Sequence, residues 1–105
     1  MNKEISAVEA SILQRNEEAI LLDVREPAEL EICRIEGALH IPLNEIPDRH
    51  STLPKDRPVI VFCHHGRRSA NVQMFLTAKG FDKIINMQGG IHAWSKDVDP
   101  QMPQY

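Results

Sequence analysis

One short segment, residues 61–70, brings together residue types that could do nucleophilic chemistry. Its sequence is VFCHHGRRSA, which places Cys63 directly after an apolar run and before two histidines, a glycine, two arginines and a serine. A thiol reacts as its thiolate, and backbone N–H groups or positive charges that face it lower its pKa from about 8.5. Gly66 permits the tight backbone curl that a loop around a sulfur atom needs. The segment therefore predicts a loop that surrounds the sulfur of Cys63 and keeps it ionised.

Positive charge gathers beside this thiol, although the chain as a whole has a formal net charge of −3. The net charge gives no general attraction to nucleic acid or to anionic membranes, whereas paired guanidinium groups can hold a small dianion. A helix that begins near the end of the segment would add its N-terminal amides to the same site. We therefore expect an anion-binding loop made of His64, His65, Gly66, Arg67, Arg68 and Ser69.

Cys63 has two other interpretations. Free cysteines favour protein interiors, so it could be a small buried side chain. It could also bind a metal with His64 and His65, but the sequence offers no fourth ligand at zinc-like spacing, and adjacent residues in a curled loop point apart. The position after a strand, the glycine, the arginine pair and the helix start together favour the reactive thiol, and we expect no metal.

Strands and helices alternate along the chain, and this alternation places the loop. The pattern predicts an α/β fold, a parallel sheet with helices on both faces. Ligands of such sheets bind at the carboxyl ends of the strands, which is where Cys63 stands. We expect strands at residues 19–24, 37–43, 57–62 and 83–87, and helices that begin at residues 6, 26, 44, 69 and 91.

Several side chains outside the loop are expected to be structural. Ser6 and Glu9 predict a capping box on the first helix, and Val8, Ile12 and Leu13 predict its core-facing stripe. We expect Cys33, His40 and His92 to be packed with their polar groups satisfied, Glu17, Glu18, Glu26, Glu29 and Glu31 to be solvated, and the tail at residues 97–105 to lie along the surface.

Four segments of the chain resemble a known family. They are LLDVREPAELE, RIEGALHIPL, VIVFCHHGRRS and MQGGIHAW, in the order found in rhodanese-like sulfurtransferase domains. The resemblance covers about residues 5–94 and implies a five-stranded parallel sheet flanked by helices. It also implies that Cys63 carries a persulfide between a sulfur donor and a thiophilic acceptor, and that the residues from His64 to Arg68 complete the active loop. Asp23 and Arg25 match the family's DVR signature and would support that loop.

The resulting hypothesis is a single domain over residues 1–105, with its core at about residues 5–96. It would move sulfane sulfur from thiosulfate or a persulfide donor to cyanide or a thiol, without a metal or organic cofactor. A protein could serve as donor or acceptor. One alternative is a sulfur-relay or binding module for cofactor biosynthesis. The other is a phosphatase or arsenate reductase of related fold, although the Cys-x5-Arg loop of phosphatases would place arginine where this chain has Ser69.

Targeting signals are not evident in the sequence. No apolar run approaches the roughly 20 residues needed to span a bilayer, and the segment MNKEISAVEA is too polar for a secretory signal. The two cysteines lack CxxC spacing and form no disulfide framework. We therefore expect a cytoplasmic protein.

Overall fold

Five short parallel strands form one sheet at the centre of the protein. The computed structural model describes residues 3–105. The strands are β1 (Glu4–Ile5), β2 (Ile20–Asp23), β3 (Leu39–His40), β4 (Val59–Phe62) and β5 (Ile84–Met87). Their order across the sheet is β1-β5-β4-β2-β3, and each pair of neighbours is parallel. The predicted parallel five-stranded sheet is confirmed.

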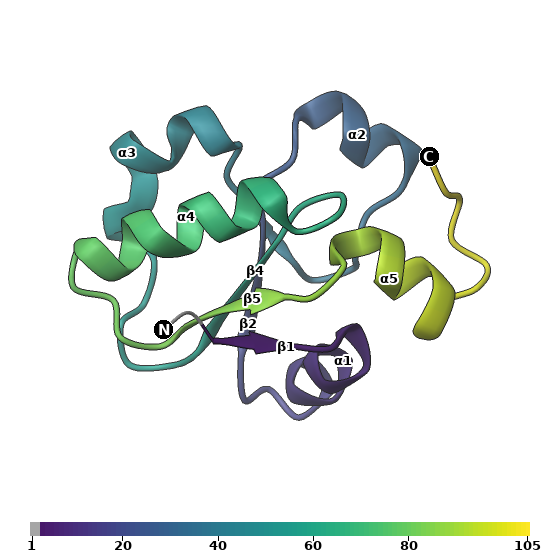
Figure 1. Ribbon diagram of the computed structural model, residues 1–105, viewed down its shortest axis with the longest axis horizontal. Coiled ribbons are helices and arrows are strands. Elements are labelled where there is room, and N and C mark those ends of the chain that lie inside the picture. Colours follow the sequence, from purple (N-terminus) through teal and green to yellow (C-terminus); the bar gives the residue numbers. More distant parts are fainter. Residues whose placement is uncertain (1–2) are drawn as a thin grey trace.

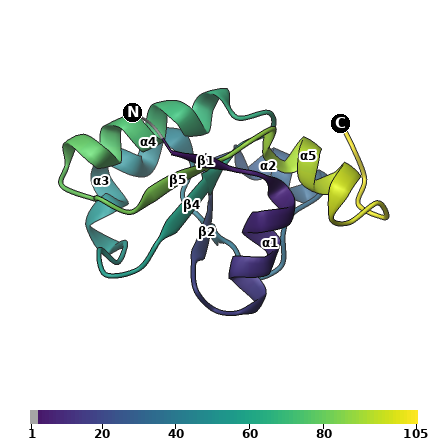
Figure 2. The ribbon, with the colours of Figure 1, turned by 60° about the horizontal axis from the view of Figure 1, so that its bottom comes forward.

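Helices cover both faces of the sheet, as predicted. In Figure 2, α3 (Ile46–Arg49) and α4 (Arg67–Ala78) lie on one side, and α1 (Ala7–Arg15) and α5 (Gly90–Asp97) lie on the other. α2 (Pro27–Ile32) follows β2 at the end towards which the strands point (Figure 1). Each face of the sheet buries its own apolar cluster. Within residues 3–105, no helix is long and apolar enough to cross a membrane.

β4 lies at the centre of both apolar clusters. Its four residues are all buried; Val59 and Val61 pack on the α4 side, and Ile60 and Phe62 pack on the α1 side. Such uninterrupted apolar strands are typical of parallel sheets covered on both faces. The chain order reverses between β2 and β4, so their carboxyl ends frame the position where open α/β sheets bind ligands. Cys63 is the first residue after β4 at this position.

The first helix has its predicted cap but a different buried face. The Ser6 Oγ accepts a hydrogen bond from the Glu9 backbone N–H (3.1 Å), and the Ser6 N–H donates to the Glu9 carboxylate (3.0 Å). The predicted core-facing stripe is wrong for Val8 and Ile12, which are 44% and 41% exposed, whereas Leu13 packs against the apolar cluster as predicted. Ala10 faces the core instead, and small side chains on this face allow α1 to lie close against α5.

Some elements differ from the predictions. β3 has only two residues, because Gly37 has a φ of +84° and Pro42 has no N–H to donate to a neighbouring strand. α4 begins at Arg67 rather than at Ser69, since Gly66 adopts a φ of +114° and serves as its N-cap. β1 was not predicted from the pattern, because an edge strand of two residues has no hydrophobic periodicity.

The C-terminal tail lies only partly on the surface. It turns back from α5 towards α2 (Figure 1), and Met102 packs into the apolar cluster on the α1 side. The Met102 N–H donates to the Asp99 carbonyl oxygen (3.0 Å) and closes a turn. The Tyr105 ring then stacks on His64, in the loop after β4. The expectation of a surface tail is therefore wrong for Met102, and Tyr105 has a defined packing position.

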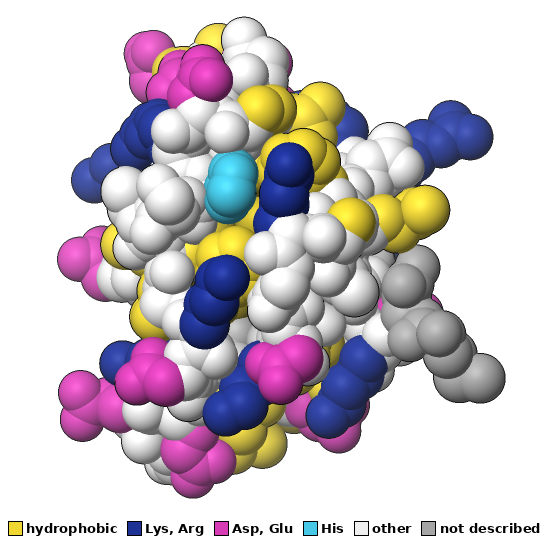
Figure 3. Space-filling view, turned by 90° about the vertical axis from the view of Figure 1, so that its left-hand side faces the viewer, with side chains coloured by type: hydrophobic (Ala, Val, Ile, Leu, Met, Phe, Trp, Pro, Cys, Tyr) yellow, Lys and Arg dark blue, Asp and Glu magenta, His cyan; other side chains and the backbone are white. Residues whose placement is uncertain are grey.

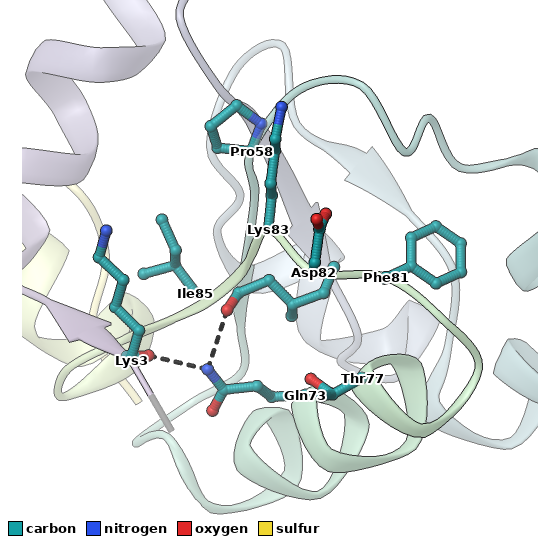
Figure 4. Close-up of a pocket in the computed structure, with 9 residues that line it drawn as sticks. Lys3, Pro58, Gln73, Thr77, Phe81, Asp82, Lys83 and Ile85 are labelled. Atoms are coloured by element: carbon teal, nitrogen blue, oxygen red, sulfur yellow. Dashed lines mark hydrogen bonds between the residues drawn. The ribbon is translucent and has the colours of Figure 1, made fainter. Parts of the chain in front are cut away.

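The amino ends of the strands form the opposite end of the molecule and border a separate cavity. It has a volume of about 310 Å³, and its lining includes Lys3, Gln73 and Lys83. The Gln73 amide donates to the carbonyl oxygens of Lys3 (2.8 Å) and Ile84 (3.1 Å), so it joins α4 to β5 and to the chain before β1 (Figure 4). Basic and acidic side chains are interspersed over this end (Figure 3). The cavity is thus distinct from the Cys63 loop at the carboxyl ends.

Candidate active site

The loop between β4 and α4 wraps around the sulfur of Cys63. The backbone N–H of Gly66 donates to Sγ at 3.1 Å, and that of Ser69 donates at 3.4 Å. Cys63 is 1% exposed, so its surroundings cover almost the whole side chain. Ser69 lies in the first turn of α4, whose N–H groups carry the positive end of the helix dipole. The backbone amides expected around the sulfur are therefore present.

The first turn of α5 holds the carbonyl groups of the loop away from the sulfur. The Ile91 N–H donates to the Cys63 carbonyl oxygen (2.8 Å), and the His92 N–H donates to that of His64 (3.1 Å). With these carbonyl groups bound to α5, the N–H groups that follow them can point inward. Gly90 lies where this contact is tightest, since a Cβ built on it would be 2.5 Å from each of the two carbonyl oxygens. The close approach of α5 requires a glycine.

Asn86 fastens the loop from the neighbouring strand β5. Its Nδ2 donates to the Gly66 carbonyl oxygen (3.3 Å), and its Oδ1 accepts from the Ser69 hydroxyl (2.6 Å). The Ser69 Oγ also lies 3.4 Å from the Cys63 Sγ. Because a hydroxyl has one proton, Ser69 cannot donate to Asn86 and to the sulfur at once. The shorter bond to Asn86 takes that proton, so the backbone N–H groups are the main donors to the sulfur.

The surroundings of Cys63 lower the pKa of its thiol below the ordinary value. Burial alone would raise this pKa, because the ionised form loses its hydration. Hydrogen bonds from the Ser69 side chain and from the backbone of Ser69, Gly66 and His65 act in the opposite direction and outweigh burial. Since the Ser69 hydroxyl is held by Asn86, we attribute most of the lowering to the three backbone groups. The site thus favours a thiolate.

We predict that this lowering can be measured as the pH dependence of alkylation. In a Cys33→Ser variant Cys63 is the only thiol, and its rate of alkylation follows the thiolate fraction. We expect a midpoint at least about one pH unit below the 8.5 of a free cysteine. Adding Ser69→Ala should move that midpoint by less than about half a unit, because the backbone N–H remains. A midpoint at or above 8.5 would mean that the amides do not stabilise the thiolate.

Asp23 and Arg25 form a buried ion pair at the end of β2. Arg25 Nη2 lies 2.7 Å from Asp23 Oδ2, and the two side chains are 0% and 2% exposed. Arg25 also donates to the carbonyl oxygens of Glu29 (3.3 Å) and Cys33 (2.9 Å), at α2. Burial alone would lower the pKa of Arg25, but its hydrogen bonds to Asp23 raise it above the usual value. Besides Asp23, the Arg25 guanidinium binds groups of α2 and Tyr105 of the tail, so the pair fixes α2 beside the loop.

Arg68 is paired with Glu29 of α2. Its Nη1 and Nη2 donate to the two carboxylate oxygens at 2.8 and 2.9 Å. Hydrogen bonds from Arg68 and from the Tyr105 hydroxyl (2.6 Å) hold the pKa of Glu29 at about 2. The expectation that Glu29 is a solvated charge is wrong, because its side chain is 17% exposed and both oxygens are bound. Arg67 is exposed and forms no ion pair within residues 3–105.

Three imidazoles and one phenol ring lie against the loop. The His64 ring stacks on Tyr105 with centroids 3.8 Å apart and lies 4.0 Å from the His65 ring. Burial lowers the pKa of His64, and repulsion by His65 lowers it further. His92 lies 5.0 Å from His65, but its buried Nδ1 has no hydrogen-bond partner, so the expectation of a satisfied packing histidine is wrong. Within residues 3–105, no group of three His, Cys, Asp or Glu side chains is placed to hold a metal ion.

Comparison with known proteins shows the family of this chain. A family model of the rhodanese-like domain matches residues 6–97. The chain belongs to the rhodanese-like domain family. This rhodanese-like domain is 39% identical over 84 residues to a sulfurtransferase of Allochromatium vinosum, covering 80% of the chain and 78% of the relative. It is 31% identical over 90 residues to the thiosulfate sulfurtransferase GlpE of Tolumonas auensis, covering 86% and 85%.

A solved structure supports the same assignment. The rhodanese-like domain protein from Staphylococcus aureus is 31% identical to this rhodanese-like domain and superposes with a TM-score of 0.83. The match covers 98% of each chain, so the sheet and the helices on both of its faces are shared throughout. The fold implied by the resemblance of the sequence is confirmed.

Only some of the residues predicted for the site contact the sulfur in this rhodanese-like domain. Gly66 and Ser69 contact the sulfur, whereas Arg68 points to α2. The sequence interpretation did not predict that Asn86 holds the loop in place. The one indication in the sequence is that Asn86 is a polar residue in an otherwise apolar strand. The sequence interpretation also missed Tyr105, because nothing in the local sequence links it to the loop. The remaining predicted residues lie around these: His64 and His65 on the outer side, Arg67 in solvent, and Asp23 and Arg25 beneath α2.

Proposed function

We propose that this rhodanese-like domain transfers sulfane sulfur through a persulfide on Cys63. The observation that supports it best is the pair of backbone N–H groups, from Gly66 and Ser69, directed at the sulfur of Cys63. Such fixed donors stabilise a thiolate before the reaction and a persulfide anion after it, without rearrangement between the two states. Similar relatives are named sulfurtransferases, and several of them are named thiosulfate sulfurtransferase. Thiosulfate or a persulfide is the donor, and cyanide or a thiol is the acceptor.

The reaction balances in two steps. The Cys63 thiolate attacks the outer sulfur of thiosulfate, a sulfur–sulfur bond forms on Cys63, and sulfite leaves with the electron pair of the bond that breaks. Cyanide or a thiolate then attacks the outer sulfur of the persulfide, and the Cys63 thiolate leaves. Because Cys63 is 1% exposed, the donor has to pass between the loop residues or displace them to reach Sγ. No proton transfer is required when the nucleophile is already ionised.

The phosphatase alternative has less support from the loop. In a Cys-x5-Arg phosphatase loop, the arginine six positions after the cysteine donates two hydrogen bonds to the phosphate oxygens. In this chain that position is Ser69. Arg68, one residue earlier, has both of its terminal nitrogens on Glu29. The loop closes tightly enough for the Gly66 N–H to lie 3.1 Å from Sγ, which favours a single sulfur atom over a tetrahedral phosphate.

The proposal is tested by comparing two reactions of the same preparation. We expect thiocyanate to form from thiosulfate and cyanide, and aryl phosphate hydrolysis to remain at the level of a Cys63→Ser variant. Rapid hydrolysis of aryl phosphate without thiocyanate formation would overturn the proposal. If Cys63 is reactive but thiosulfate and aryl phosphate are both inert, the sulfur-relay module becomes the better explanation.

A further inference from the structure

Glu29 is an unusual acidic residue to find beside a loop that is expected to bind anions. Its carboxylate accepts four hydrogen bonds: from Arg68 Nη1 (2.8 Å) and Nη2 (2.9 Å), from the Tyr105 hydroxyl (2.6 Å) and from the Glu26 N–H (2.9 Å). The Glu29 and Arg68 side chains are 17% and 33% exposed. A two-pronged pair of this kind, supported by further donors, holds its geometry better than a surface ion pair.

Arg68 is close enough to the sulfur for its charge to matter. The residue after it, Ser69, donates its backbone N–H to the Cys63 Sγ (3.4 Å). Hydrogen bonds to Glu29 raise the pKa of Arg68 most, and the negative charge of Cys63 raises it further. The guanidinium therefore lies within electrostatic reach of the reacting atom, although its two terminal nitrogens are bound to Glu29 and its charge is paired with that carboxylate.

The arginines beside the loop differ in whether they are paired with a carboxylate. Arg25 is paired with Asp23, and burial together with repulsion by His65 lowers the pKa of His64, which disfavours a positive charge on its ring. Arg68 is neutralised by Glu29, which leaves Arg67 as the loop arginine that has no ion pair within residues 3–105. An approaching donor thus meets one arginine of the pair, Arg67, without a bound carboxylate, while the charge of Arg68 is offset by Glu29.

We propose that Glu29 is a specificity-determining residue that withdraws Arg68 from donor binding and biases the site towards sulfur donors carrying one negative charge rather than two. The inference rests on the proposed function and names the donor class that the site prefers. Monoanionic donors include alkyl and aryl thiosulfonates and ionised hydropersulfides, whereas thiosulfate is a dianion. Tyr105 contributes as a positioning residue, because its hydroxyl holds the carboxylate of Glu29 in place.

The test compares two donors that differ in charge but deliver sulfur from the same kind of bond. Thiosulfate carries two negative charges and benzenethiosulfonate carries one, and each releases its outer sulfur from a sulfonyl sulfur. In Glu29→Gln the amide has one acceptor oxygen and no charge, so Arg68 loses one of its two hydrogen bonds and its charge is no longer offset. We expect kcat/KM for thiosulfate to rise about five- to tenfold at low salt, mainly through KM, while that for benzenethiosulfonate changes less than about twofold.

Two further variants separate this effect from a change in structure. Glu31→Gln removes the same charge from an exposed position in α2. It should leave the ratio of kcat/KM for thiosulfate to kcat/KM for benzenethiosulfonate unchanged. Glu29→Gln with Arg68→Gln replaces a neutral ion pair by a neutral pair of amides, so the ratio should return to within about twofold of the wild-type value. Because the double variant leaves no unpaired charge, it remains informative even if Glu29→Gln alone is poorly folded.

Three outcomes would overturn the inference. The donor ratio could stay constant in Glu29→Gln, Glu31→Gln could change it equally, or the double variant could lose thiosulfate activity selectively. The last result would mean that Arg68 binds thiosulfate in the wild type despite its pairing with Glu29. If the wild-type protein uses neither donor, the proposed function fails instead, and that result is separate from a constant ratio.

Discussion

Replacing Cys63 by serine is expected to abolish sulfur transfer while leaving the fold intact. The hydroxyl of serine keeps its proton at neutral pH and cannot form a persulfide, so kcat/KM with thiosulfate and cyanide should fall by at least about 10³-fold. The fold should persist, because serine differs from cysteine by one atom and its Oγ can still accept from the Gly66 and Ser69 N–H groups. We expect the melting temperature to change by less than about 5 °C.

Cys33→Ser is the matched control for this prediction. Cys33 is also buried, at the end of α2, but it lies in the apolar cluster on the α1 side, whereas Cys63 lies in the cluster on the other side. We expect this variant to retain wild-type activity within about twofold. If Cys63→Ser kept full activity and Cys33→Ser lost it, the reacting thiol would be Cys33.

The second large effect is expected for Gly90→Ala, which changes no group that contacts the sulfur. Gly90 has a φ of +60°, and its new Cβ would lie 2.5 Å from the carbonyl oxygens of Cys63 and His64. Those two carbonyl groups are bound by the first turn of α5, so relief of the clash has to move the loop away from α5. A displacement of about 1 Å at a reacting group costs roughly 10²-fold in rate, and we expect a loss of this size. The melting temperature should fall by about 10 °C.

Gly37→Ala separates backbone strain from displacement of the loop. Gly37 also has a positive φ, +84°, but its new Cβ would meet only the end of the Gln14 side chain, at 3.4 Å. We expect a loss of about 1–2 kcal/mol in stability from the left-handed backbone alone, with kcat/KM unchanged within about twofold. Equal losses of activity in both variants would contradict the role of Gly90, since strain alone would then explain them.

The features predicted well from the sequence are those with a local cause. β4 is an apolar run buried on both faces, and the cysteine loop follows it in the chain, so its position at the carboxyl edge follows from the alternation of strand and helix. The capping box of α1 depends on two residues three positions apart. In each case the interacting groups are close in the sequence, so the order and spacing of the residues are enough to predict how they are arranged.

The features missed by the sequence analysis depend on contacts between distant segments. Glu29 and Arg68 are 39 positions apart, and Tyr105 is 76 positions from Glu29. Only the folded sheet brings these three together, so no local pattern distinguishes Glu29 from a solvated glutamate. The buried face of α1 has a similar cause. Hydropathy favours Val8 as an inward residue, but close packing against α5 selects alanine.

The mass of the intact protein after incubation with thiosulfate tests the central claim most directly. Wild-type protein should gain about 32 Da, the mass of one sulfur atom, which maps to Cys63 and disappears when cyanide is added. Cys63→Ser should gain nothing under the same conditions. Thiocyanate formation by wild-type protein with no sulfur adduct on Cys63, or with the adduct on Cys33, would contradict a Cys63 persulfide as the carrier of the sulfur.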